Sequence, residues 1–188
     1  MYRYIVASMK KSNIIDADNE AVILFGLRGI LFLVLNLIST FIIAFAMSSF
    51  FYTGFFLLNY ACIRSFSGGY HASSRLKCYI LSCIIIIIAS FLIARIDLSV
   101  NAIIMLFVVN FIIIIGLSPL ENALRKLSGV EKERYRKTIL VIVFLQMVLL
   151  CLPVGIRYKT ALVLANSCVS MLLIIGLIAG KMEMWKKN

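Results

Sequence analysis

The sequence predicts an all-α, polytopic integral membrane protein with about six transmembrane helices. Two observations lead to this prediction. The chain of 188 residues is 63% hydrophobic, whereas soluble domains are about half apolar. Its apolar residues also gather in long runs with few charges, and one crossing of a bilayer needs about 20 such residues. Because no repeat or low-complexity linker divides the chain, we expect residues 1–188 to form a single membrane domain.

The N-terminal segment, 1–19, predicts an amphipathic helix that lies in the membrane interface. Tyr2, Ile5, Val6 and Met9 fall on one face of such a helix, and two lysines follow. A disordered tail that contains some apolar residues is the alternative. The segment lacks an apolar stretch followed by a cleavage site, so we expect no signal peptide and no loss of the spans.

Hydropathy then places the spans along the chain. The predicted spans are 21–46, 50–63, 78–94, 100–117, 138–153 and 160–180. The first two are separated only by "SSFFYTG", which allows a turn although it holds no strong helix breaker. The length of 21–63 nevertheless favours a hairpin of two helices over one continuous helix.

Two serine-to-glutamate patterns predict helix starts within the polar, basic stretch 118–137. The tetrapeptide "SPLE" predicts a short helix over 119–127, because serine suits the N-cap and proline the first helical position. The tetrapeptide "SGVE" predicts that the fifth span begins as a basic helix near residue 129.

The charge distribution predicts the orientation in the membrane. With six spans, all lysines and arginines except Arg95, Arg157 and Lys159 lie on the side that holds both termini. The positive-inside rule assigns this side to the cytoplasm. Basic residues next to a membrane that contains anionic lipids already account for the net charge of +11. We therefore expect anionic lipids as partners and no nucleic acid.

The polar segment "RSFSGGYHASSRLKC" joins the second and third spans and ends at Cys78. Ser73 or Ser74 can cap the third helix, which places Cys78 in its first turns. The helix dipole there favours a thiolate, and Arg75 and Lys77 add positive charge nearby. A lowered thiol pKa is what a nucleophilic cysteine needs.

His71, the only histidine in the chain, is the natural base for this thiol. On a continuous helix His71 and Cys78 would lie about 10 Å apart, too far for the contact of about 3 Å that a base needs. The chain must therefore fold back within the loop 64–77, and Gly68 and Gly69 permit such a turn. The alternative is a histidine that simply forms hydrogen bonds at the level of the lipid headgroups.

The remaining cysteines, Cys62, Cys83, Cys151 and Cys168, are interpreted as small apolar packing residues. No two cysteines form a CxxC pair, and a single histidine argues against a zinc site, so no metal site is expected. The odd number of cysteines, five, argues against a disulfide framework.

The same segment closely resembles the motif of the accessory gene regulator B family, bacterial membrane peptidases that mature quorum-sensing autoinducing peptides. The family pattern has an arginine, a Gly-Gly-x-His element and a cysteine seven residues after the histidine. These fall on Arg64, Gly68, Gly69, His71 and Cys78, with no departure within this core. The chain length, the hydropathy and the basic loop before the fifth span are also similar.

The resemblance implies a cysteine endopeptidase without a cofactor. Its substrate would be a short membrane-bound propeptide with an acidic C-terminal tail. Cys78 would attack the carbonyl before the tail, with His71 as base, and form a thioester. A cysteine or serine of the propeptide would then capture the acyl group as a cyclic thiolactone or lactone. The resemblance also implies a homodimer.

Supporting roles follow from the same resemblance, each beside a plainer interpretation. Arg64 either holds a substrate carboxylate or extends to the headgroups. The amides of Gly68 and Gly69 either form an oxyanion hole or serve turn geometry. Arg125 and Lys126 bind either an acidic propeptide tail or lipid.

Two further questions remain open at the level of sequence. No acid lies between residues 64 and 78, so Glu121 and "DADNE" are the candidates to orient His71. A small transporter or peptide exporter without peptidase activity is the alternative function. Such proteins usually carry ionisable residues within their spans, and here Arg28 is nearly alone. A non-catalytic sensor or scaffold would need no thiolate, so thiol alkylation in a cleavage assay separates these classes.

Overall fold

The computed structural model describes residues 20–69, 74–121 and 127–185. The predicted interfacial helix within 1–19 lies outside this part of the chain. The described residues form helices and connections, without strands, which confirms the all-α class. The helices are α2 (Glu20–Ala46), α3 (Phe50–Ser67), α4 (Arg75–Arg95), α5 (Val100–Leu117), α6 (Gly129–Cys151) and α7 (Ile156–Trp185).

Each helix covers one predicted span, and four helices of the described chain are long and apolar enough to cross a bilayer. These four are Val22–Ala46 of α2, Arg75–Arg95, Val100–Leu117 and Ile156–Gly180 of α7. Helix α3 is more polar, with Asn59 and Arg64 in its sequence, and α6 opens with the charged stretch "EKERYRK". The prediction of a helical membrane protein is confirmed.

The predicted hairpin between the first two spans is confirmed, with its turn at residues 47–49. Ser48 adopts a positive φ of 53°, which reverses the chain direction. The hydroxyl of the buried Ser49 lies 3.0 Å from that of Thr53, which lies 3.0 Å from the hydroxyl of Ser90 on α4. Polar side chains therefore stabilise a turn that contains neither glycine nor proline.

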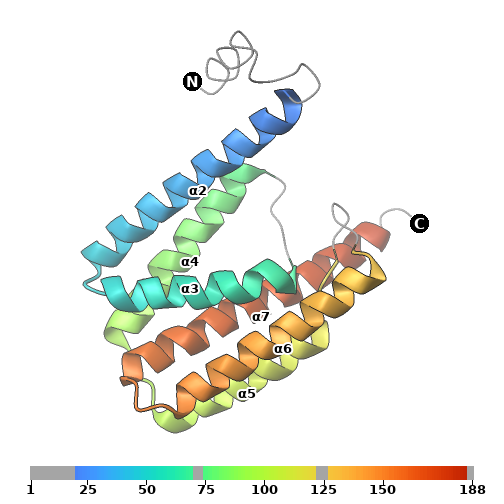
Figure 1. The fold of residues 1–188 in the computed structure, drawn as a ribbon. Coiled ribbons are helices and arrows are strands. Elements are labelled where there is room, and N and C mark those ends of the chain that lie inside the picture. The colour runs from blue at the N-terminus through green and yellow to red at the C-terminus, as the bar shows by residue number, and fades with distance from the viewer. Residues whose placement is uncertain (1–19, 70–73, 122–126, 186–188) are drawn as a thin grey trace.

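The six helices divide into two groups (Figure 1). Helices α3, α5, α6 and α7 pack along one another around a core that includes Ile63, Phe107, Val143 and Leu173. Helices α2 and α4 lie side by side and diverge from this group toward the end that carries the α3–α4 connection (Figure 1). Phe56 and Ile93 belong to a second, smaller core, where α4 meets α3 and α7.

A chain of buried amides links three helices inside the larger group. The Gln146 Nε2 donates to Asn59 Oδ1 at 3.1 Å, and the Asn166 Nδ2 donates to Gln146 Oε1 at 3.0 Å. These side chains are 7%, 2% and 1% exposed for Asn59, Gln146 and Asn166. Small and amide side chains hold membrane helices together, because hydrocarbon offers them no other partner. The chain thus fixes α3, α6 and α7 relative to one another.

The prediction that a short helix over 119–127 begins after Ser118 is wrong. Ser118 ends α5 instead of beginning a new helix, since its backbone N–H donates to Ile114. Residues 119–121 are not helical, and 122–126 lie outside the described residues. Leu120 forms a backbone bridge with Gly68, so pairing with a distant segment outweighs the local capping pattern.

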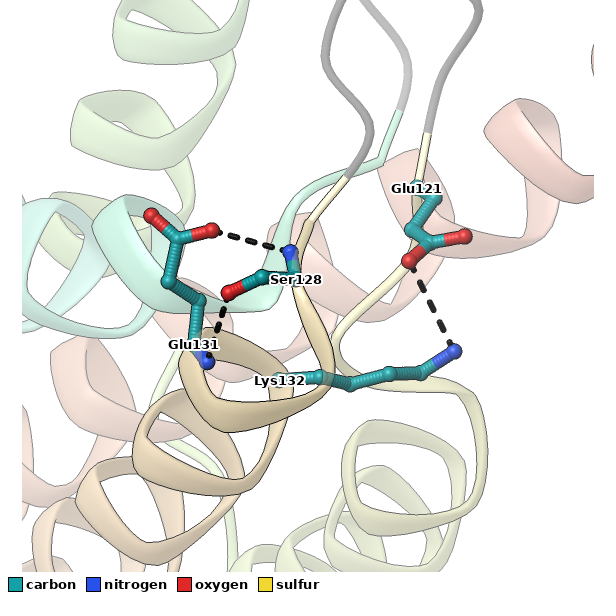
Figure 2. A network of polar contacts seen from close by, with 4 residues as sticks. All are labelled: Glu121, Ser128, Glu131 and Lys132. Carbon is teal, nitrogen blue, oxygen red and sulfur yellow. Dashed lines mark hydrogen bonds and ion pairs between the residues drawn. The ribbon is translucent and has the colours of Figure 1, made fainter.

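The second capping prediction is confirmed at the start of α6 (Figure 2). The Ser128 hydroxyl accepts from the Glu131 backbone N–H at 3.3 Å, and the Ser128 backbone N–H donates to Glu131 Oε2 at 2.9 Å. This capping box satisfies two backbone N–H groups reciprocally and starts the basic helix at Gly129.

Candidate active site at the α3–α4 connection

The end of α3 is fixed by a glycine pair that no other residue could replace without rearrangement. Gly68 has φ of 70° and Gly69 has φ of 106°, both in the region that favours glycine. A Cβ on Gly68 would overlap the carbonyl oxygen of Leu120. The Leu120 backbone N–H also donates to the Ser67 carbonyl at 2.9 Å. The segment after α5 therefore packs directly on the start of the connection.

Gly69 passes between α7 and an arginine. A Cβ at this position would lie 3.1 Å from the carbonyl oxygen of Leu172 and 3.2 Å from Arg64 Nη1. These distances are tighter than ordinary contacts, so the absent side chain allows the backbone to approach α7. The glycine pair thus has a clear packing role, and the approach of Arg64 brings a positive charge to the backbone of the connection.

Arg64 lies in the last turn of α3 and is half-buried. Its guanidinium forms a side-chain hydrogen bond with Tyr60, one turn earlier on the same helix. Together with the approach to Gly69, this contact holds the charge beside the glycine turn.

Cys78 lies one turn into α4 and is exposed. Ser74 is the N-cap, as predicted, since its hydroxyl accepts from the Lys77 backbone N–H at 3.2 Å. The Cys78 backbone N–H donates to the Ser74 carbonyl at 3.1 Å, the first regular bond of the helix. Cys78 therefore lies within the first turns of α4, at the positive end of the helix dipole.

The two cations expected beside Cys78 differ in their surroundings. Arg75 turns toward α2, where its Nη1 donates to the Phe25 carbonyl at 3.2 Å and its guanidinium lies 4.2 Å from the centre of the Phe25 ring. Lys77 is exposed next to Cys78 in the chain. Arg75 therefore joins α4 to α2.

His71, Arg125 and Lys126 lie outside the described residues, so the structure does not place them relative to Cys78. The described residues on either side of the His71 segment are Gly69, packed against α7, and Ser74, the cap of α4. Both ends of the segment are thus held by specific contacts of the kind that position a catalytic loop.

Glu121, a candidate partner of His71, forms an ion pair with Lys132 at 3.7 Å (Figure 2). A second pair joins Glu133 and Lys137 at 2.7 Å on the first turns of α6. Its hydrogen bond and charge lower the pKa of the Glu133 carboxyl and raise the pKa of the Lys137 amine.

The other cysteines are distributed over α3, α4, α6 and α7, and the described cysteines form no disulfide. Cys83 is half-buried on α4, whereas Cys62 and Cys151 are exposed. Within the described residues, no group of three histidine, cysteine or acidic side chains could hold a metal ion.

A comparison across protein families identifies the family of the chain. The model of the family "Accessory gene regulator B" matches residues 2–184. The chain belongs to the accessory gene regulator B family. This AgrB-family protein is therefore a multi-pass membrane protein that takes part in quorum sensing by processing an autoinducing propeptide. No match was found among curated proteins or solved structures.

The structure also shows polar features around the connection that the motif and the charges do not predict. Three hydroxyls near the connection, those of Ser67, Ser118 and Ser170, are buried without a hydrogen-bond partner among the described residues. For Ser170 and the buried amides, the signal in the sequence is a neutral polar residue inside an otherwise apolar run. The charged residues within the spans, such as Arg28, do not indicate where these neutral polar side chains lie.

Proposed function

We propose that this AgrB-family protein is a cysteine endopeptidase in which Cys78 is the nucleophile and His71 the general base. The observation that carries this proposal is the position of Cys78, exposed one turn into the capped helix α4 and directly after the segment that holds His71. A thiol at a helix start is activated by the dipole, and a histidine in the preceding segment can supply proton transfer.

The chemistry proceeds in two acyl transfers. His71 accepts the thiol proton, the Cys78 sulfur attacks the peptide carbonyl before the C-terminal tail, and the C–N bond breaks. The leaving amine takes the proton from His71, and the signal peptide remains on Cys78 as a thioester. A thiol or hydroxyl within the propeptide then attacks this thioester and forms a thiolactone or lactone, and the displaced Cys78 sulfur regains a proton. The activated acyl bond is conserved until the ring closes.

Two features support the glycine pair and Arg64 as parts of this site. The Arg64 guanidinium is held between Tyr60 and the backbone at Gly69, which brings a fixed positive charge to the connection. A fixed cation suits either a substrate carboxylate or the negative oxygen of a tetrahedral intermediate. The backbone amides of the connection would provide the remaining donors.

We place the α3–α4 connection and both termini in the cytoplasm. Arg64, Arg75, Lys77 and the basic start of α6 all belong to the end of the helices that carries this connection. At the other end, Arg157 pairs with Asp97 at 3.8 Å, which offsets its charge. The positive-inside rule favours this orientation, and the basic end suits anionic lipids.

The first turns of α6 are a suitable contact for an acidic propeptide tail. Lys132 and Lys137 are paired with glutamates, while Arg134 and Arg136 are exposed on the same helix. Arg125 and Lys126 precede this helix in the chain and would extend the basic surface. By family resemblance, we also expect the working unit to be a homodimer.

The decisive experiment is capture of the acyl-enzyme. The protein in lipid vesicles is incubated with a propeptide whose ring-forming residue is replaced by alanine, then quenched in acid and digested for mass spectrometry. We expect a hydroxylamine-sensitive adduct on the peptide that contains Cys78 and release of the tail. Tail release from Cys78→Ala protein, or an adduct on another cysteine, would contradict the assignment. Movement of intact propeptide across the vesicle without cleavage would favour a transporter.

A further inference from the structure

A cavity of about 450 Å³ lies between α2, α3 and α4. This volume falls within the range of about 300–1,000 Å³ that is typical of ligand sites. The lining is mostly apolar. Its residues include Leu37 and Phe41 of α2, Leu57 and Ala61 of α3, and Ser82 and Ile86 of α4.

One end of this cavity approaches the candidate nucleophile. Ser82 follows Cys78 by four residues on α4, so the two side chains share a helix face at a separation of about one turn, 5.4 Å. Tyr60 of α3 lines the same cavity, and its side chain forms a hydrogen bond with Arg64, one turn later on that helix. The cavity and the candidate site therefore share a wall.

We infer that this cavity binds apolar side chains of the propeptide on the N-terminal side of the cleaved bond. The inference rests on the proposed function, because it takes the Cys78 sulfur as the atom that carries the acyl group. A residue extends at most about 3.6 Å along the chain. The first side chains of an acyl group attached to Cys78 would thus reach the part of the cavity that Ser82 lines.

The lining matches a peptide segment better than a lipid chain. Tyr60 and Ser82 belong to the lining, and their hydroxyl groups are suitable hydrogen-bond partners for a peptide backbone. Hydrocarbon side chains such as Leu57 and Ile86 form most of the remaining lining, which also includes Asn36 and Thr40. A lipid acyl chain has no polar group to use the hydroxyls, whereas a peptide with apolar side chains uses both parts of the lining.

The first test fills the cavity and varies the substrate. Two propeptides carry either phenylalanine or alanine immediately before the cleaved bond, and kcat/KM is measured for each in vesicles. We expect wild type to prefer phenylalanine by at least about tenfold, as apolar pockets discriminate by side-chain size. Ala61→Leu and Gly54→Leu reduce the free volume, since nothing lies within 4 Å of a Cβ at Gly54. Both should lower cleavage of the phenylalanine substrate and abolish the preference.

A matched control is present on α5. Gly116 is also a helical, exposed glycine, and a Cβ at this position would have nothing within 4 Å. It lies outside the cavity lining. Gly116→Leu should keep the wild-type preference. Equal losses for both substrates in the cavity variants, or an unchanged preference, would overturn the inference and favour a lipid or purely structural role.

A second test does not depend on catalysis. A propeptide with benzoylphenylalanine before the cleaved bond is irradiated with Cys78→Ala protein in vesicles, and cross-linked residues are mapped by mass spectrometry. Labelling of Leu57 or Ile86 supports the inference, and labelling confined to other helices contradicts it. Because loss of Cys78-dependent cleavage tests the proposed function and the cross-link tests the cavity, failure of either can be recognised separately.

Discussion

The backbone N–H of Leu120 donates to the carbonyl oxygen of Ser67 at 2.9 Å, which joins the segment after α5 to the last residue of α3. The Leu120 carbonyl oxygen also lies so close to Gly68 that it would overlap with a Cβ at that position. The entry to the candidate active site is therefore shaped by a segment that is distant in the sequence.

Gly68→Ala should destabilise the connection and reduce processing. The positive φ alone costs a non-glycine residue about 1–3 kcal/mol, and the overlap with the Leu120 backbone adds to this cost. Thermal unfolding in detergent and propeptide processing measure the two effects. Gly116→Ala, where the space around the glycine is open, is the control and should retain both stability and activity. Wild-type behaviour of Gly68→Ala would show that the turn differs from the one described.

Cys78→Ala should abolish tail release while the protein remains in the membrane. Cys78→Ser should be nearly as inactive, because a hydroxyl is a far weaker nucleophile than a thiolate. His71→Ala should lose most activity, and the double variant should be scarcely worse than either single variant, since such pairs act as a unit. Processing is compared at matched membrane levels.

Cys83→Ala is the control for this series and should retain activity. Cys83 lies five residues further along α4, away from the α3–α4 connection, and is half-buried. If Cys83→Ala alone were inactive, the nucleophile would have been assigned to the wrong cysteine.

Gln146→Leu should lower the free energy of unfolding by about 1–3 kcal/mol, because it removes the hydrogen-bond partner of both Asn59 and Asn166 inside the bundle. Unfolding in mixed micelles measures this loss. Met147→Leu changes the neighbouring residue, which is 46% exposed, and should have little effect. Equal stability of the two variants would show that the amides contribute nothing measurable.

The Glu133 carboxyl should titrate below the usual glutamate value, because Lys137 donates a hydrogen bond to it and adds an attractive charge, which lowers the pKa. A lowered folded-state pKa means that its contribution is present at pH values above the usual glutamate pKa and is lost as the pH falls through the lowered value. NMR titration of labelled glutamates measures this shift. Lys137→Ala should return the pKa of Glu133 toward the usual value, and high salt should act in the same direction.

Cysteine-accessibility labelling in intact cells should find positions near 71, 130 and 185 protected from external reagents and positions near 97 and 157 accessible. The basic end of the helices determines this expectation. External labelling at position 71 would reverse the proposed orientation, and with it the cytoplasmic location of the substrate tail.

Local signals predicted much of this fold. Hydropathy placed the six helices, and the serine caps at Ser74 and Ser128 predicted the starts of α4 and α6. These features depend on neighbouring residues alone. The pattern at Ser118 failed because Leu120 found a backbone partner at Ser67, a contact between distant segments that local capping rules do not include.

The three-dimensional surroundings of the candidate site could not be predicted in the same way. Asn59 and Gln146 are separated by 87 residues, and the cavity beside Cys78 arises only from the packing of three helices. Arg75 was expected to act on Cys78, but the aromatic ring and carbonyl of Phe25 hold its guanidinium toward α2. The sequence identified the residue types of the candidate site, but it could not predict the contacts that orient their side chains.

Through the contact between Arg75 and Phe25, α2 helps to fix the position of the helix start that carries the candidate nucleophile. Arg75 is the first residue of α4, shortly before Cys78, and its bond to the Phe25 carbonyl spans 50 residues of sequence. A displacement of the N-terminal part of α2 would therefore carry Cys78 with it. Fusion tags or truncations that pull on this part of the chain should thus disturb catalysis.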